Sequence, residues 1–380
     1  MRSIWLGNRT EFDFHGKVLE GAVCLGDIDN DGEVELVVGS MTGTLNVFKG
    51  EELWQSLSGL GSIAAIGVGD VMNCGSNAVI IITVDGICYV YLCLNNAGEK
   101  LQLVHRQALP PNTKSMVIGE ALGNGQTYMI LGTTDNLVRL FKWLQNPTEA
   151  NLACLHQTKC PAEIGSICIG KNSQGRTTIY VSQPSPNYIT FQYPRSEFSG
   201  EKPVVETQSI NTNIACNTVS QFVASVKKNG INVITMFNGS VLYVENGHDV
   251  KWSLDLELQL FKSAKVNVSP KSNAGDQQIV TAAWSGHTFI VNTDGQVVQF
   301  ELGLPIIAFT AGPYGPGGST AFVYVTFENK IILCRNVLIE DFVLKDPLAS
   351  LATDPELSAY SGDQLRKLTQ YLLYDFPKRT

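Results

Sequence analysis

The run LGDIDNDGEVELVVG occupies residues 25–39 of the chain. Three aspartates alternate with other residues, at Asp27, Asp29 and Asp31, and Glu35 opens a strand-like apolar run. Carboxylates at alternate positions of a tight loop converge on one point, as hard cations such as calcium require. The run also recurs in weaker form along the chain, so it indicates an architecture as well as a chemistry.

Each recurrence is a strand of small apolar residues that ends in glycine and a polar residue. The polar residues are Asp27, Asp70, Glu120 and Lys171, which lie 43, 50 and 51 residues apart in turn. A repeat of about 40 to 50 residues is typical of a four-stranded propeller blade. Hairpin signals follow at the expected places; for example, Asp85-Gly86 separates two apolar runs.

The second half of the chain repeats less clearly but supplies three more blades. Residues 231–244 fit the middle hairpin of a fifth blade, residues 278–301 fit a sixth, and residues 304–334 supply three strands of a seventh. Residues 10–14 are expected to add the fourth strand of that last blade, because ring closure removes exposed sheet edges. Residues 194–220 carry no clear blade pattern and are predicted to form a loop excursion with a weak first strand.

We therefore predict an all-β, seven-bladed β-propeller over residues 1–336 and a short helical tail over residues 337–380. In the tail, Asp363 is the predicted N-cap of a helix over residues 364–374. This helix either packs against the propeller or binds a partner subunit. In the second case the anchors are Tyr371, Leu372 and Leu373.

The composition favours a β-rich protein with many turns. Of 380 residues, 44% are hydrophobic, 16% are charged and 35 are glycine, and the net charge is −8. The chain has no large Lys/Arg cluster, so nucleic acid is not an expected partner. No apolar run reaches the roughly 18 residues of a membrane span, and the N-terminus lacks a signal-peptide pattern. We expect an intracellular protein with free cysteines and no direct membrane insertion.

The acidic loop and the strand after it resemble the FG-GAP repeat of the integrin-alpha propeller. More specifically, the chain resembles the intracellular integrin-alpha FG-GAP repeat-containing proteins, the propeller subunits of the KICSTOR complex. The resemblance extends over residues 10–374. It is carried by residues 22–31, 66–71, 111–114, 181–184 and 254–261, and most specifically by residues 307–312 and 323–331.

This resemblance implies a non-catalytic scaffold in nutrient sensing. It implies a cytoplasmic protein, peripheral at the lysosomal surface, whose direct partners are kaptin and a very large scaffold subunit. Through them it implies an indirect link to the GATOR complex, which is recruited to lysosomes and restrains mTOR (mTORC1) signalling when nutrients are scarce.

The acidic loop is the predicted metal site. In integrin-type loops Asp27, Asp29, Asp31 and Glu35 would bind calcium by side chain and Glu33 by its backbone carbonyl. The alternative is an empty turn whose aspartates accept hydrogen bonds from backbone amides. The second and third repeats do not retain the ligands, since Met72 and Cys74, and Leu122 and Asn124, stand at the corresponding positions. One structural calcium ion is the only cofactor predicted, and the empty turn stays open.

Two other functions remain as alternatives. A propeller enzyme with a channel site would need His, Asp or Glu at matching inner-strand positions, whereas these strands are small and apolar. No Gly-x-Ser-x-Gly elbow is present, and no catalytic residue is predicted. An integrin-like calcium-binding adhesion propeller is disfavoured by the single intact acidic loop.

Overall fold

The structure, a computed structural model, describes residues 2–93, 100–145, 150–196, 201–210, 218–226, 229–267, 277–341 and 360–371. The chain divides into two compact units. One is formed by Ile4–Ile339, and the other by Met1–Ser3 together with Glu340–Thr380. Within the described ranges no helix is long and apolar enough to cross a membrane.

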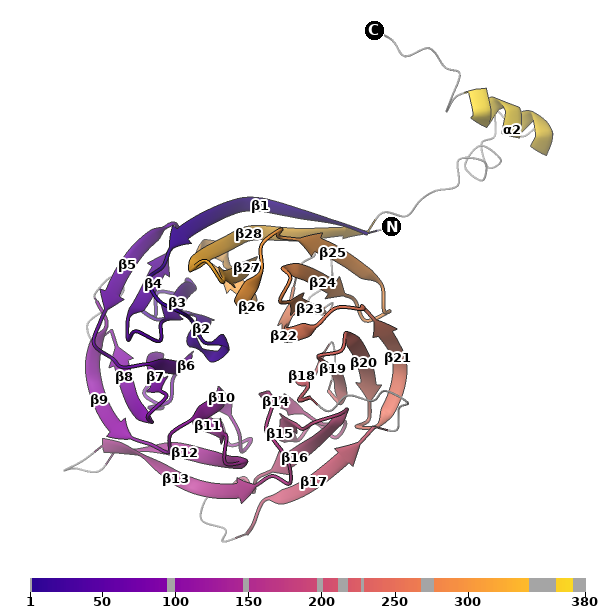
Figure 1. The fold of residues 1–380 in the computed structure, drawn as a ribbon. Helices are drawn as coiled ribbons and strands as arrows, with labels where there is room; N and C mark the ends of the chain where they lie inside the picture. Colours follow the sequence, from indigo (N-terminus) through magenta and orange to yellow (C-terminus); the bar gives the residue numbers. More distant parts are fainter. Residues whose placement is uncertain are drawn as a thin grey trace. The chain divides into compact units, whose positions relative to one another are not determined.

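The larger unit is a ring of seven four-stranded sheets, which confirms the predicted seven-bladed β-propeller (Figure 1). Blade 1 comprises β2 (Val23–Gly26), β3 (Glu35–Gly39), β4 (Leu45–Lys49) and β5 (Glu52–Leu57). Blade 2 comprises β6 (Ile63–Gly69), β7 (Ala78–Thr83), β8 (Ile87–Leu92) and β9 (Gln102–Ala108). Blade 3 comprises β10 (Thr113–Glu120), β11 (Thr127–Thr133), β12 (Leu137–Gln145) and β13 (Ala150–Lys159). Blade 4 comprises β14 (Ile167–Lys171), β15 (Thr177–Ser182), β16 (Asn187–Gln192) and β17 (Val204–Ser209).

The remaining three blades follow the same plan. Blade 5 comprises β18 (Gln221–Val223), β19 (Ile231–Thr235), β20 (Ser240–Glu245) and β21 (Asp249–Asp255). Blade 6 comprises β22 (Leu260–Val266), β23 (Gln278–Ala283), β24 (His287–Val291) and β25 (Val297–Glu301). Blade 7 comprises β26 (Ile306–Tyr314), β27 (Ser319–Thr326), β28 (Lys330–Asp341) and, on its outer edge, β1 (Arg2–Asp13). Short 3-10 turns lie at η1 (Glu20–Ala22) and η2 (Pro316–Gly318).

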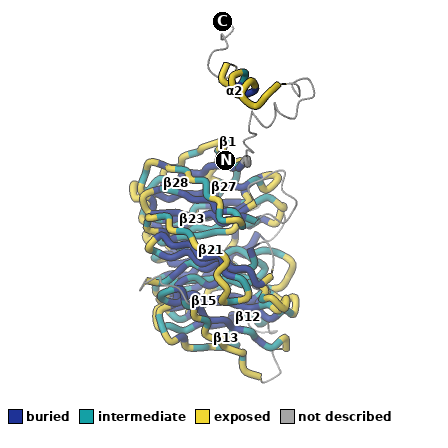
Figure 2. Tube along the Cα trace, turned by 90° about the vertical axis from the view of Figure 1, so that its right-hand side faces the viewer, coloured by how far each residue is buried: buried dark blue, intermediate teal, exposed yellow. Residues whose placement is uncertain are grey.

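The core lies between neighbouring blades. Every residue of β3, β7 and β19 is buried. Val37 of blade 1 and Val79 and Ile81 of blade 2 belong to one apolar cluster. Figure 2 shows the buried strands in dark blue, with exposed residues at the turns and outer strands. This pattern follows from the apolar runs, because a strand covered on both faces is apolar throughout.

A glycine near the end of the inner strand lets the next blade approach closely. A Cβ added at these glycines would crowd the neighbour: at Gly26, 2.6 Å from Val68 Cβ; at Gly69, 2.8 Å from Ile118 Cγ2; at Gly119, 3.0 Å from Ile169 Cδ1; and at Gly170, 2.5 Å from Ala224 Cβ. These are the glycines of the repeat that the sequence shows. The glycine in the repeat is therefore required by blade-to-blade packing.

Three sequence-based predictions differ from the structure. The closing strand of blade 7, expected over residues 10–14, is β1 and extends from Arg2 to Asp13. Residues 194–220, predicted as a loop excursion with a weak first strand, contain β17, the fourth strand of blade 4. Most residues of β17 are exposed, so the strand carries no alternating apolar pattern. In the tail, α2 (Gly362–Gln370) begins before the predicted N-cap Asp363. Its N-cap is Ser361, whose amide donates to Gln364 Oε1 (2.8 Å), as in a capping box.

Candidate functional site

The loop of residues 27–34 joins β2 to β3 in blade 1. Its first carboxylate is part of the turn, since the Gly32 amide donates to Asp27 Oδ2 (3.0 Å). The same bond recurs in the next two blades: Gly75 N to Asp70 Oδ2, 2.8 Å, and Gly125 N to Glu120 Oε1, 2.7 Å. An acid at this position therefore closes the turn even in blades that lack the other carboxylates.

Asn30 ties this loop to blade 2. Its Oδ1 accepts a hydrogen bond from Asn77 N (2.6 Å), and its Nδ2 donates to Asn77 O (3.4 Å). Asn73 of blade 2 makes the equivalent pair with Thr127 of blade 3, at 2.7 and 3.0 Å. Asn30 and Asn73 have φ of 61° and 54°, and asparagine tolerates this left-handed conformation better than most residues. The loops thus act as clamps between adjacent blades.

Replacing Asn30 with glycine is expected to lower the free energy of unfolding by about 1–2 kcal/mol, because Asn30 makes two hydrogen bonds to the neighbouring blade. Glycine keeps the positive φ, so this variant isolates the bonds from backbone strain. Asn30→Ala should lose about 1 kcal/mol more, from the strain alone. Urea unfolding measures both. Equal stability of Asn30→Gly and wild type would contradict the clamp.

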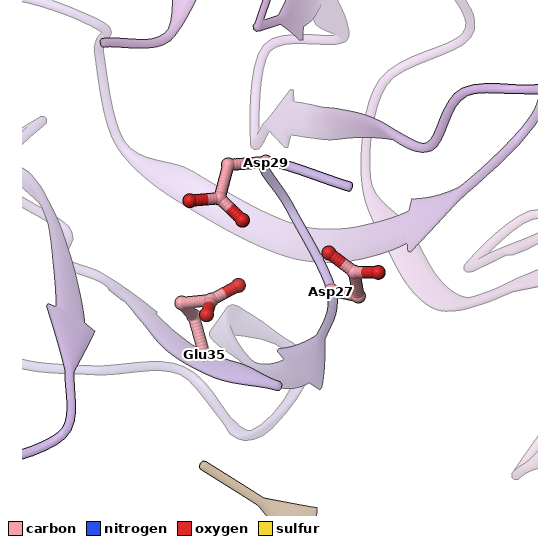
Figure 3. Close-up of side chains that lie close together, drawn as sticks. All are labelled: Asp27, Asp29 and Glu35. Carbon is pink, nitrogen blue, oxygen red and sulfur yellow. The ribbon is translucent and has the colours of Figure 1, made fainter. Parts of the chain in front are cut away.

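Three carboxylates of blade 1 gather at the loop. Side-chain oxygens of Asp27, Asp29 and Glu35, one from each residue, lie within 4.8 Å of one another. Figure 3 shows Asp27 and Asp29 on the loop and Glu35 on the adjoining strand, around a shared space. Asp29 and Glu35 are only 2% and 1% exposed. One oxygen of each of the three residues is buried without a hydrogen-bond partner: Asp27 Oδ1, Asp29 Oδ1 and Glu35 Oε1.

The other two predicted ligands are arranged differently. Asp31 is more exposed and does not join this three-residue group. Its Oδ1 accepts a hydrogen bond from the Glu33 amide (2.8 Å), which is the contact expected of a turn. The structure therefore brings Asp27, Asp29 and Glu35 together. Asp31 is linked to this cluster by a salt bridge to another residue, which also contacts Asp29.

That residue is Lys49, the last residue of β4. Its Nζ lies 2.8 Å from Asp29 Oδ2 and 3.7 Å from Glu35 Oε1, and it also contacts Asp31 Oδ2. Sequence reasoning missed Lys49, because the residue is 14 positions beyond Glu35 and belongs to another strand. A lysine that ends the second strand after the loop is the signal that could have found it.

Burial and the local charges together shift three pKa values. Burial, and then the negative charges of Asp29 and Asp31, raise the pKa of Glu35 to about 7, against the opposing Ile28 amide and Lys49. Burial alone would lower the pKa of Lys49, but its hydrogen bonds to Asp29 and Asp31 outweigh this and raise it. For Asp31, burial acts upward, but the bond from Lys49 and the Glu33 amide bring its pKa below the usual value. Lys49 is therefore held in its charged form.

These contacts bear on the predicted calcium ion. Four carboxylates of the loop fit the oxygen chemistry of calcium. The Lys49 ammonium, however, contacts three of them: Asp29, Asp31 and Glu35. In this arrangement the residues do not fit a calcium ion unless Lys49 moves away. Calcium binding and the backbone ligand role of Glu33 stay predictions.

The predicted partner-binding anchors of the tail are only partly described. Tyr371 lies at the C-cap of α2 and is 47% exposed. Leu372 and Leu373 lie outside the described residues. Their proposed role stays a prediction.

A cavity of about 960 Å³ is lined mostly by residues of the inner strands. Its wall includes glycines, short apolar side chains and the thiols of Cys24 and Cys168. Burial raises the pKa of Cys24 to about 11 and that of Cys168 to about 12, so neither is an activated thiolate. The charged lining residues include Glu20 and Lys262, which pair at 3.1 Å.

Comparison with known proteins identifies a matching family. A family model described as integrin-alpha FG-GAP repeat-containing protein 2 matches residues 49–204 and 197–339. The chain is 28% identical to the KICSTOR complex protein ITFG2 of Mus musculus, over 94% of this chain and 90% of the mouse protein. It is also 28% identical to the protein of that name from Bos taurus, over 93% of this chain and 75% of the bovine protein.

Solved structures share the propeller fold at low sequence identity. One crystal structure of BBS1N in complex with ARL6DN, soaked with mercury, matches with a TM-score of 0.62 and 16% identity, over 88% of this chain and 98% of the matched chain. A second, soaked with lead, matches with a TM-score of 0.62 and 14% identity, over 87% and 96%. At these identities the likeness concerns the fold alone.

Proposed function

This chain belongs to the family of integrin-alpha FG-GAP repeat-containing protein 2, and we propose that it serves as a non-catalytic propeller subunit of a KICSTOR-type complex. The observation that carries the proposal is the similarity to curated relatives named KICSTOR complex protein ITFG2, which extends over at least 93% of this chain. The predicted membership in this family is confirmed by the family match.

The propeller supports a scaffold role physically. Its seven blades are joined by apolar clusters that span neighbouring sheets, and by side-chain clamps such as Asn30 to Asn77. A closed ring of packed blades keeps its shape and presents broad surfaces. Specific protein interfaces typically bury about 1,200–2,000 Å². The central cavity, with its unactivated thiols, gives no support to an enzymatic role.

The finer assignment follows from the family resemblance. We propose kaptin and a very large scaffold subunit as direct partners, and the GATOR complex as an indirect partner. The site of action would be the lysosomal surface, reached through these partners, and the output would be restraint of mTOR signalling when nutrients are scarce.

Affinity purification of the full chain tests this proposal. The tagged chain is expressed in nutrient-starved and in fed cells, and the co-purified proteins are quantified by mass spectrometry. We expect kaptin and the large scaffold subunit at near-equal amounts to the bait. An unrelated seven-bladed propeller with the same tag is the control. Recovery of the chain alone, or of the same proteins with the control bait, would contradict membership in the complex.

A further inference from the structure

We propose that the ammonium group of Lys49 is the resident cation of the blade 1 loop, in the place where an FG-GAP loop would hold a divalent ion. The loop is then closed by a covalently attached monovalent cation and does not depend on bound metal. This inference concerns the chemistry of the loop and is independent of the proposed complex.

Strand register places Lys49 among the carboxylates. In the β3–β4 pair, Leu36 lies opposite Phe48, so Glu35 and Lys49 are the next residues on the two strands. Phe48 is buried and packs on Phe12, with ring centroids 4.4 Å apart. Because successive side chains of a strand point to opposite faces, Lys49 is directed away from that packing. It reaches the loop, where its Nζ lies 2.8 Å from Asp29 Oδ2.

The contacts leave no place for a second cation at the same oxygens. Calcium binds oxygens at about 2.3–2.6 Å and takes six to eight of them. Asp29, Asp31 and Glu35 would have to serve both the ion and the ammonium that they already contact. The two positive charges would then lie a few ångströms apart and repel each other, with two of the shared carboxylates almost fully buried.

The carboxylate cluster nevertheless contains buried oxygens that form no hydrogen bond with the Lys49 ammonium. Asp27 Oδ1, Asp29 Oδ1 and Glu35 Oε1 are buried without hydrogen-bond partners. These oxygens are available to a cation if the ammonium is removed. A variant that lacks Lys49 should therefore acquire the calcium site that the wild-type side chain occupies.

Blade 3 supplies a matched control within the chain. In the β11–β12 pair, Met129 lies opposite Phe141, so Lys142 occupies the position that corresponds to Lys49. The blade 3 loop has Leu122, Asn124 and Tyr128 where blade 1 has Asp29, Asp31 and Glu35. Lys142→Met thus removes a lysine from the same strand position without exposing a carboxylate cluster.

Calcium titration of the full chain tests the inference. Wild type, Lys49→Met and Lys142→Met are freed of metal with EDTA and titrated with calcium chloride by calorimetry. Melting temperatures are recorded in EDTA and in calcium. Wild type and Lys142→Met should bind no calcium and melt at the same temperature in both buffers. Lys49→Met should melt lower in EDTA, bind one calcium ion and recover part of the loss.

Two outcomes would overturn the inference. One is a wild-type chain that binds calcium and loses stability in EDTA. The other is a folded Lys49→Met chain that binds no calcium, which would show that the Lys49 ammonium does not occupy a calcium site.

A measurement on the wild-type chain keeps the inference testable if Lys49→Met does not fold. Lysine residues are labelled briefly with an acetylating reagent, and the label at each position is quantified by mass spectrometry. Lys49 should be labelled much more slowly than the exposed Lys159, and at the same rate in EDTA and in calcium. Faster labelling of Lys49 in calcium would show that the ion displaces the ammonium, which contradicts the inference. Labelling of Lys49 as fast as Lys159 in both buffers would contradict it as well.

Discussion

Replacing Lys49 with methionine is expected to lower the free energy of unfolding in calcium-free buffer by about 3 kcal/mol, because removal of one partner from a buried ion pair leaves uncompensated charge. The partners Asp29 and Glu35 are each 1% exposed at the side chain, whereas Lys49 is 28% exposed. The partial exposure of Lys49 places the expected loss at the lower end of the range for buried pairs. Urea unfolding in EDTA, followed by tryptophan fluorescence, measures it.

The control for this prediction is Lys142→Met, which should lose less than about 1 kcal/mol, as is usual away from a buried charge cluster. Adding Asp31→Asn to Lys49→Met should restore part of the stability, because it removes one of the mutually repelling carboxylates. A Lys49→Met chain as stable as wild type in EDTA would show that the carboxylates tolerate one another without the ammonium.

The repeat architecture could be predicted from sequence because its signals are local. The glycine and the polar residue at the end of the first four inner strands recur every 43 to 51 residues. In blade 1 the structure shows a separate reason for each of them. Gly26 admits Val68 of the next blade, and Asp27 accepts the Gly32 amide to close the turn. The close glycine contact recurs in blades 1 to 4 and the acid-closed turn in blades 1 to 3, so they appear as a periodic pattern in the first half of the chain.

An exposed strand, and a residue that strand pairing brings to the site, could not be predicted in this way. The outer strand β17 faces solvent at most positions, so no alternation marks it. Lys49 belongs to the site only because the β3–β4 register places it beside Glu35. The acids of the loop identify a place for a cation, but only the register shows that a side chain of the same blade reaches it.

A resident ammonium in the blade 1 loop also bears on the proposed scaffold. Cation sites of FG-GAP type would tie the stability of a blade to the concentration of the free ion. With Lys49 in that place, the link between blades 1 and 2 made by Asn30 and Asn77 is independent of calcium. A scaffold of this kind would keep its surfaces when the calcium concentration changes.

Replacing Gly26 with alanine is expected to destabilise the propeller by about 2–3 kcal/mol, because an inserted methyl group overpacks the contact between two inner strands. The Cβ would lie 2.6 Å from Val68 Cβ and 2.7 Å from Val68 Cγ1, so the β-branched side chain or the backbone of β6 must shift.

Gly312 on the inner strand of blade 7 is the matched control. A Cβ there would meet Leu25 Cδ1 at 3.5 Å, an ordinary contact distance. Gly312→Ala should therefore change stability by less than about 1 kcal/mol. Urea unfolding of the two variants compares them directly, and Val68→Ala should rescue Gly26→Ala by making room for the methyl group. Equal losses in the two glycine variants, or no rescue by Val68→Ala, would show that close packing at Gly26 is not what fixes glycine in the repeat.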